Sequence, residues 1–226
     1  MDAIDKTALI LCIVVCMSSS QAWLREHFSD PYVKQAKQQG YPSRAAYKLL
    51  EIQAKDHLLK SGHVVVDLGA APGGWSYVAR EHVGSQGVVI AVDQQPMTSL
   101  AGMYFLQGDL NDPTLLDQLK QAVKERSGRS TVDLVISDMA PNISGEKSID
   151  QPRSLHLVEL AWDCARQLLK PRGVFLAKAF QGSGLDDLIA ELRLHFEHVK
   201  LRKPQSSRSR SSEVYILGNG FLGYNQ

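Results

Sequence analysis

Short apolar runs alternate along the chain with segments in which apolar residues recur at helical spacing. The apolar runs are β-branched or bounded by glycine, proline and acidic residues, which predicts buried strands. Strands are predicted at 64–67, 87–93, 104–109, 132–136, 174–177, 198–201 and 213–218. Helices are predicted at 43–52, 114–125, 154–170 and 185–195. This alternation indicates an α/β fold with a mostly parallel sheet.

A glycine-rich turn follows the first predicted strand and opens a helix. Residues 64–76 read VVVDLGAAPGGWS, and glycine lets the backbone approach a bound molecule without Cβ collisions. The free N–H groups at the start of the helix face the same crevice. The second strand ends in Asp93, about 20 residues further on, where an acidic residue holds a ribose diol in doubly wound folds. The pattern therefore predicts a nucleoside-containing ligand.

The spacing of the glycines indicates which kind of nucleoside-containing ligand the loop binds. A dinucleotide site needs G-x-G-x-x-G, whereas the loop from Gly69 to Gly74 reads GAAPGG and lacks the second glycine, which admits a pyrophosphate. This spacing argues against an NAD(P)-dependent oxidoreductase. S-adenosylmethionine carries an adenosine and an amino-acid tail but no phosphate, so we predict it as the cofactor. A glycine-rich turn without a ligand is the alternative.

Composition narrows the class of protein. The 226 residues suit one domain, and a hydrophobic content of 44% suffices for its core. A net charge of +1 excludes a globally basic protein, so any affinity for nucleic acid has to come from local patches. The three cysteines form no disulfide framework and lack histidine partners for a metal, so we expect no metal and a reduced, cytoplasmic protein.

The N-terminus allows three interpretations. Residues 8–17 form an apolar run that is too short to span a bilayer but long enough for the core of an export signal. Asp2 and Asp5 give this run an acidic leader, although residues 20–22 loosely resemble a cleavage site. We favour a start at Met17, with residues 1–16 as a translated upstream extension and 17–226 as a single domain without a membrane partner. Intact-mass analysis of the endogenous protein would decide, since a species beginning at Met1 would exclude this interpretation.

Charged residues stand at the ends of several predicted strands. Asp109 ends the third strand, Asp138 follows the fourth and Lys178 follows the fifth. The carboxyl ends of parallel strands meet at one edge, where ligands of open α/β sheets bind. A lysine at the end of a buried strand is costly unless it has a partner or a task. We therefore expect chemistry at this edge.

Three stretches with basic residues are candidates for contact with a phosphate backbone. In the helix at 43–52, we expect Ser43 to act as the cap and Tyr47, Leu50 and Ile52 to face the core, and Arg44 and Lys48 share the other face. Residues 202–212 are basic and rich in serine, which suits a loop that follows RNA. Residues 19–41 mix aromatic and basic residues in the same way. A merely solvated surface is the alternative for each.

Several motifs occur together in the order of a known family. They are Ser43-Arg44-Ala45 before Lys48, DLGAAPGGWS at 67–76, SDMAPN at 137–142, KAFQG at 178–182 and SRSRSSEVY at 207–215. With these motifs, residues 23–218 resemble the FtsJ/RrmJ family of RNA ribose 2′-O-methyltransferases. The resemblance implies a class I (Rossmann-like) methyltransferase with a seven-stranded mostly parallel sheet, helices on both faces and a C-terminal antiparallel hairpin. Residues 1–16 have no counterpart in the family pattern.

The resemblance also implies site residues. The family's Lys-Asp-Lys-Glu tetrad falls on Lys48, Asp138, Lys178 and Glu213. Its cofactor contacts fall on Gly73, Trp75, Asp93, Asp109 and Asp138, although Trp75 could equally be a core aromatic behind the loop. The implied reaction is methyl transfer from S-adenosylmethionine to the 2′-hydroxyl of a uridine in large-subunit ribosomal RNA, in the assembled 50S subunit, by a monomer. A non-catalytic ribosome-assembly factor and methylation of another RNA are the alternatives.

The implied tetrad has a physical logic. A ribose 2′-hydroxyl does not ionise at pH 7, so its attack needs a positioned proton acceptor or a field that favours the alkoxide. We assign that role to Lys178, which we expect Asp138 to orient. Burial and Lys48 lower the pKa of Lys178 while Asp138 raises it, and the sequence leaves the balance open. Lys48 and Glu213 are expected to place the ribose.

Overall fold

A seven-stranded sheet forms the centre of the molecule. The computed structural model describes residues 29–98, 101–208 and 210–223. The strands are β1 (Val64–Leu68), β2 (Val88–Asp93), β3 (Met103–Gln107), β4 (Val132–Ser137), β5 (Leu169–Phe180), β6 (Phe196–Arg202) and β7 (Glu213–Phe221), in the order β3-β2-β1-β4-β5-β7-β6. Neighbouring strands from β3 to β5 are parallel, whereas β7 pairs antiparallel with both β5 and β6. The predicted fold class is confirmed.

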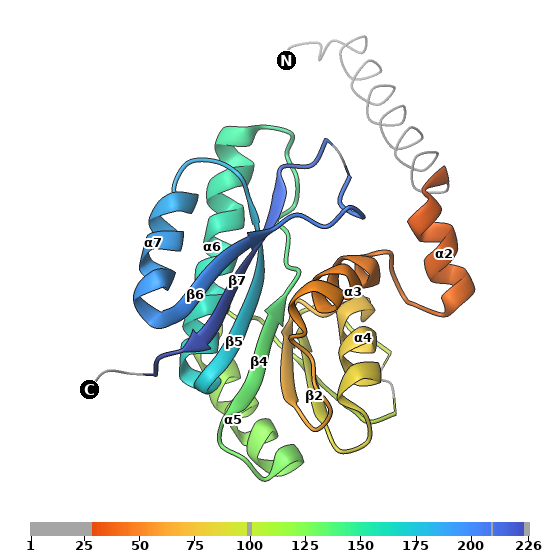
Figure 1. The fold of residues 1–226 in the computed structure, drawn as a ribbon, viewed down its shortest axis with the longest axis vertical. Helices are drawn as coiled ribbons and strands as arrows, with labels where there is room; N and C mark the ends of the chain where they lie inside the picture. Colours follow the sequence, from red (N-terminus) through yellow and green to blue (C-terminus); the bar gives the residue numbers. More distant parts are fainter. Residues whose placement is uncertain (1–28, 99–100, 209, 224–226) are drawn as a thin grey trace, which may run out of the picture.

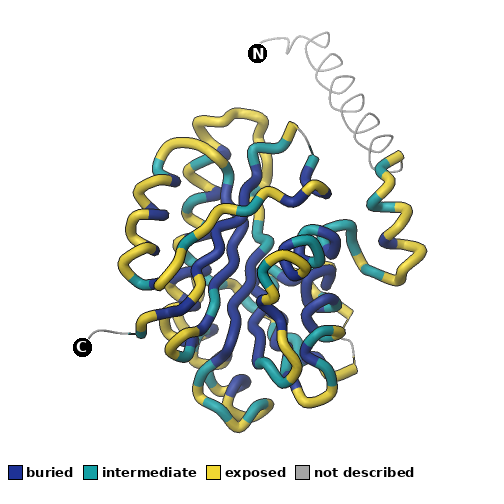
Figure 2. Tube along the Cα trace, viewed as in Figure 1, coloured by how far each residue is buried: buried dark blue, intermediate teal, exposed yellow. Residues whose placement is uncertain are grey.

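Helices cover both faces of this sheet (Figure 1). They are α2 (Pro31–Gln39), α3 (Ala45–Asp56), α4 (Gly74–Val83), α5 (Pro113–Ser127), α6 (Lys147–Leu168) and α7 (Leu185–His195). Helices α3 and α4 enclose one core with the sheet, and α5, α6 and α7 enclose the other. Figure 2 shows the buried strands between helices whose outer sides are exposed, with α2 standing out beside α3.

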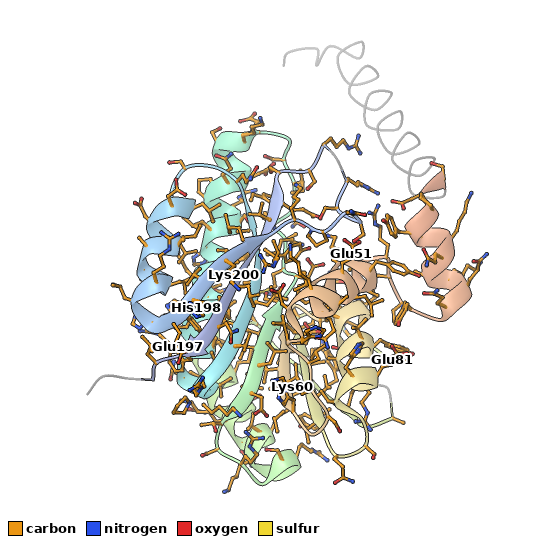
Figure 3. The ribbon with its side chains drawn as sticks, viewed as in Figure 1. Glu51, Lys60, Glu81, Glu197, His198 and Lys200 are labelled. Atoms are coloured by element: carbon orange, nitrogen blue, oxygen red, sulfur yellow. The ribbon has the colours of Figure 1, made fainter. Side chains whose placement is uncertain are left out.

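Burial along each strand reflects its place in the sheet. The central strands β1 and β4 are buried at every position, as expected for strands covered on both faces. The edge strand β6 is mostly exposed and carries Glu197, His198 and Lys200 (Figure 3). Charged side chains on an edge discourage pairing with another chain, so β6 closes the sheet without inviting a further strand.

Two local predictions were wrong and a third was incomplete. Arg44, and not Ser43, is the N-cap residue of α3, and the Ser43 hydroxyl has no hydrogen-bond partner among the described residues. Leu49 is fully buried in the core on this side, whereas Leu50 is only partly buried against it. Helix α6 begins at Lys147, before the predicted 154, because Asp150 in its first turn accepts hydrogen bonds from the backbone of Ser144 and Gly145.

The boundary between α6 and β5 also differs from the prediction. Residues 171–173 read as a helix stop, yet β5 already begins at Leu169. The ladder with β4 shifts register here, since Val132 pairs with Leu169 and Leu134 with Val174. Such a bulge leaves residues without hydrogen-bond partners on the neighbouring strand. Pro171, which has no backbone N–H to donate, is therefore tolerated within β5.

The N-terminal predictions lie outside the described residues. They concern the extension at 1–16, the start at Met17 and the part of the arm before Ser29, and all of them stay predictions. Within the described ranges, no helix is long and apolar enough to cross a membrane.

Asp133 of β4 ties three elements together at the edge opposite the carboxyl ends of the strands. Its carboxylate, 4% exposed, accepts hydrogen bonds from the backbone N–H of Val64 and the Arg129 guanidinium, both at 2.8 Å, and pairs with the Lys170 ammonium. Burial raises the pKa of Asp133, but these three donors outweigh it and lower the pKa to about 2.

We therefore expect acid to weaken the fold through this carboxyl group. The folded pKa lies below the unfolded value of 3.8, so the stabilisation is present above pH 4 and is lost as the pH falls towards 2. Asp133→Asn should remove about 2 kcal/mol of the free energy of unfolding at pH 7 and much less near pH 2. Urea unfolding of both proteins at several pH values measures this, and an equal difference at every pH would contradict it.

Candidate active site

A cavity of about 740 Å³ opens at the carboxyl ends of the parallel strands. It is lined by Gly69, Ala71 and Pro72 after β1, residues 92–96 at the end of β2, residues 108–111 after β3, residues 138–142 after β4 and several residues of α6. Strand order reverses between β1 and β4, and ligands of open α/β sheets bind at such a switch point. The volume suits a nucleoside-sized ligand.

Asp93 and Asp109 both line this cavity, and their predicted contact with a cofactor stays a prediction. Asp93 accepts hydrogen bonds from the backbone N–H of Ala71 at 2.9 Å and of Gln95 at 2.8 Å. Each of its oxygens keeps a further lone pair for a ligand hydroxyl. The Asp109 carboxylate accepts from the backbone and side chain of Asn111, both at 2.9 Å, which lowers its pKa.

Gly73 and Trp75 lie outside the lining of the cavity. Gly73 caps α4 with a φ of +106°, a conformation that favours glycine, so it shapes the turn. The Trp75 ring is 2% exposed, and its indole N–H donates to the carbonyl of Ala45 at 2.9 Å. Its side chain therefore occupies the core behind the loop, which was the alternative interpretation, and contact between its backbone and a cofactor stays a prediction.

The four tetrad residues converge beside the cavity. The Lys178 ammonium lies 3.1 Å from Oδ1 of Asp138 and donates to the Asp138 carbonyl at 2.6 Å. The Lys48 ammonium lies 3.0 Å from the Glu213 carboxylate and 4.0 Å from Oδ1 of Asp138. All four side chains are 17% exposed or less. Asp138 also lines the cavity, so it joins the two parts of the site.

Sheet register brings most of these side chains together. In the antiparallel pair, Lys178 of β5 stands directly opposite Tyr215 of β7, and Phe180 stands opposite Glu213. Residues directly opposite each other share a face, and so do residues two apart on one strand. Lys178, Tyr215 and Glu213 therefore lie on one face of the sheet, and α3 places Lys48 over it.

Both tetrad carboxyl groups favour the ionised form. Burial raises the pKa of Asp138, but the Lys178 and Lys48 ammonium groups outweigh it and lower the net value. Burial likewise raises the pKa of Glu213, and the Lys48 charge reverses the shift. The site thus holds two carboxylates between two lysines, away from bulk water.

Tyr215 is a site residue that the sequence analysis missed. Its hydroxyl donates to Oδ1 of Asp138 at 2.7 Å, and its ring is fully buried. The Lys48 ammonium lies 5.8 Å from the ring centroid. Burial, together with Asp138 and Glu213, raises the pKa of Tyr215 well above its usual value, so it acts as a donor. Its spacing of two residues from Glu213 in a strand was the available signal.

We expect Tyr215→Phe to lower the rate of the site's reaction while leaving cofactor affinity nearly unchanged. A hydrogen bond to a charged group contributes about 1.5–3 kcal/mol, so kcat should fall roughly 10- to 100-fold. Lys178 and Lys48 still hold Asp138 after the change, so the fold should survive. Steady-state kinetics and calorimetric cofactor binding test this, with Tyr77→Phe on α4 as the matched control. An unchanged kcat would show that the hydroxyl does not position Asp138.

Comparison with known proteins assigns the class. The chain belongs to the FtsJ-like methyltransferase family, whose model matches residues 41–221. It is 60% identical over 210 residues to a Coxiella burnetii protein named Ribosomal RNA large subunit methyltransferase E, covering 93% of this chain and 99% of that one.

Solved structures share the fold. A Plasmodium falciparum protein described as a putative ribosomal RNA methyltransferase is 28% identical, with a TM-score of 0.72 over 81% of this chain and all of that one. Human methyltransferase-like protein 13, solved in complex with SAH, is 16% identical, with a TM-score of 0.50 over 80% of this chain and 81% of that one. The latter likeness concerns the fold alone.

Proposed function

We propose that this protein is a ribosomal RNA methyltransferase that transfers a methyl group from S-adenosylmethionine to the 2′-hydroxyl of a uridine in large-subunit ribosomal RNA. One observation carries the proposal: Asp138 lines the cavity and also contacts two lysines of the tetrad. A cofactor in the cavity and a ribose at the tetrad would thus meet at a shared residue.

The charges of the cavity support S-adenosylmethionine as the cofactor. Three carboxylates line it, those of Asp93, Asp109 and Asp138, against one guanidinium, that of Arg153. Such an excess of negative charge favours a cationic sulfonium over a phosphate. Asp93 would accept from the ribose diol, and Asp109 would lie beside the adenine. Gly73 shapes the loop in which the amino-acid tail would lie. Membership of the FtsJ-like methyltransferase family is consistent with this choice.

The tetrad can position and activate a hydroxyl group. When bound, S-adenosylmethionine supplies a methyl group that is already activated by the sulfonium. Lys178, in its neutral form, would accept the 2′-hydroxyl proton, or as an ammonium it would stabilise the alkoxide. Asp138 holds the Lys178 nitrogen, and Lys48 with Glu213 would orient the ribose. Alignment alone can contribute about 7–11 kcal/mol to such a displacement.

Two observations support the proposal that the substrate is ribosomal RNA. The relative that is 60% identical carries ribosomal RNA in its name. In this chain, Arg44 is the N-cap residue of α3, four residues before Lys48, and Arg208 lies on the loop that leads to Glu213, although the net charge is only +1. Local arginines of this kind suit a phosphate backbone. We further propose that the protein acts in the cytoplasm, as a monomer, on the assembled 50S subunit.

The test is methyl transfer from radiolabelled S-adenosylmethionine to large ribosomal subunits, and separately to bare 23S RNA, from cells that lack this gene. We expect label on the ribose 2′-oxygen of one uridine, more with subunits than with bare RNA, and none with the Lys178→Ala variant. Label on another nucleotide or RNA would correct the substrate. Cofactor binding without transfer to any RNA would favour the assembly-factor alternative instead.

A further inference from the structure

A second pocket, of about 260 Å³, is lined by residues at the start of α2, at the start of α3 and on the loop that joins β6 to β7. We call it the arginine pocket. It is lined by Ser29, Asp30, Pro31, Tyr32, Arg44, Ser206, Ser207 and Arg208. None of these residues lines the cofactor cavity.

One carboxylate lies between two guanidinium groups in this pocket. Arg44 donates to the Asp30 carboxylate and to the carbonyl of Ser206. Nε of Arg208 lies 3.9 Å from the same Asp30 oxygen. The Asp30 side chain is only 8% exposed. Both guanidinium groups face the same Asp30 oxygen, Oδ2. Guanidinium groups bind the oxygens of carboxylates and phosphates alike, so a phosphate oxygen suits this position.

The walls of the pocket are fixed by specific contacts. The Glu51 carboxylate on α3, labelled in Figure 3, accepts from the backbone N–H of Gln205 at 2.5 Å and of Ser206 at 2.9 Å, which holds the loop against α3. Arg44 lies 5.5 Å from the centroid of the Tyr32 ring. The Ser206 residue is fully buried, and its hydroxyl has no partner among the described residues. An unsatisfied hydroxyl at a pocket wall is a donor available to an anion.

The pocket adjoins the tetrad. Arg44 precedes Lys48 by four residues at the start of α3, a spacing that places the two Cβ atoms about 5–6 Å apart on one face. The loop that carries Ser206 and Arg208 continues directly into Glu213. When a ribose is held at the tetrad, the two phosphodiesters that flank it lie within one nucleotide's length of the tetrad. One of them would lie on the side of the arginine pocket.

We propose that the arginine pocket binds one phosphodiester of the RNA strand next to the target nucleotide, and that the Asp30 carboxylate occupies the phosphate position in the RNA-free protein. The proposal rests on the proposed function for the identity of the strand. Asp30 then acts as a built-in competitor that an incoming phosphate displaces. Because Asp30 also caps α2 by accepting from the Tyr32 N–H at 2.9 Å, RNA binding is coupled to the start of that helix.

The Asp30→Asn variant tests the negative charge of Asp30 apart from its role as the N-cap of α2. Asparagine keeps the acceptor for the Tyr32 N–H and caps helices as well as aspartate does, but it lacks the negative charge. With a fluorescein-labelled oligouridine of ten nucleotides, we expect Asp30→Asn to bind about fivefold more tightly than the wild type at physiological salt. Adding Arg44→Gln or Arg208→Gln to Asp30→Asn should cancel this gain.

The matched control is Asp117→Asn on the exposed face of α5, which changes the net charge equally. Because it lies outside the pocket, salt should screen its effect on RNA affinity. Three outcomes would overturn the proposal: unchanged or weaker affinity in Asp30→Asn, an equal gain in Asp117→Asn, or a gain that survives Arg44→Gln. If methyl transfer to subunits is intact in any of these cases, only this proposal fails. If the wild type neither binds RNA nor transfers methyl, the proposed function fails with it.

Discussion

Replacing Lys178 with alanine is expected to abolish detectable methyl transfer while the affinity for S-adenosylmethionine stays within about twofold of the wild type. General-base catalysis contributes roughly 10²- to 10⁴-fold, and Lys178 is the lysine closest to Asp138 at the cavity, 3.1 Å from its carboxylate. The Asp138 carboxylate keeps the Tyr215 hydroxyl and the Lys48 ammonium after the change, so it is not left buried without partners. Single-turnover rates and calorimetric cofactor binding measure the two quantities.

Lys200→Ala is the matched control for this variant. Lys200 is exposed on the edge strand β6, outside both the cavity lining and the tetrad, so its removal changes the net charge equally without touching the site. Near-normal turnover of Lys178→Ala would show that the base or stabiliser is another group. Loss of cofactor affinity in Lys178→Ala would instead mean that the lysine holds the cofactor cavity together.

Replacing Asp93 with alanine is expected to weaken the binding of S-adenosylmethionine roughly 10- to 100-fold. Hydrogen bonds to a charged acceptor contribute about 1.5–3 kcal/mol, and the change also frees the backbone N–H groups of Ala71 and Gln95, which Asp93 holds in the cavity wall. Turnover at saturating cofactor should recover most of its value, because Asp93 lies outside the tetrad.

Calorimetric titration with S-adenosylmethionine tests this expectation, and Asp117→Ala on α5 is the control that removes a carboxylate elsewhere. An unchanged dissociation constant would remove Asp93 from the cofactor site. A loss of turnover that persists at saturating cofactor would instead assign Asp93 a part in the reaction.

Elements with strong local signals could be predicted from the sequence. The run that begins at Val64 is apolar and β-branched, and it forms β1, which ends at Leu68, one residue beyond the predicted end at Asp67. Asp93 and Asp109 could be placed at the cavity because parallel strands end at one edge, which makes the position of a strand-end residue a consequence of topology. The antiparallel order of the last strands came from the family resemblance.

Features that depend on contacts between distant segments could not be predicted. The early start of α6 depends on hydrogen bonds between Asp150 and the preceding loop. The extension of β5 across Pro171 depends on a register shift against β4. The core position of Trp75 follows from how α3 and β7 pack around it, and the spacing of residues along the chain does not contain that information. For Tyr215, the two-residue spacing from Glu213 indicates only a shared face of the strand, and its contact with Asp138 depends on the packing.

The position of β7 between β5 and β6 has a consequence for synthesis of the protein. All residues that line the cofactor cavity precede residue 161, whereas Glu213 and Tyr215 belong to the last strand. A ribosome therefore completes the walls of the cofactor cavity long before it completes the tetrad. A chain that terminates early, before residue 213, lacks both residues and leaves β5 and β6 without the strand that joins them. We therefore expect truncated products of translation to lack methyl transfer activity.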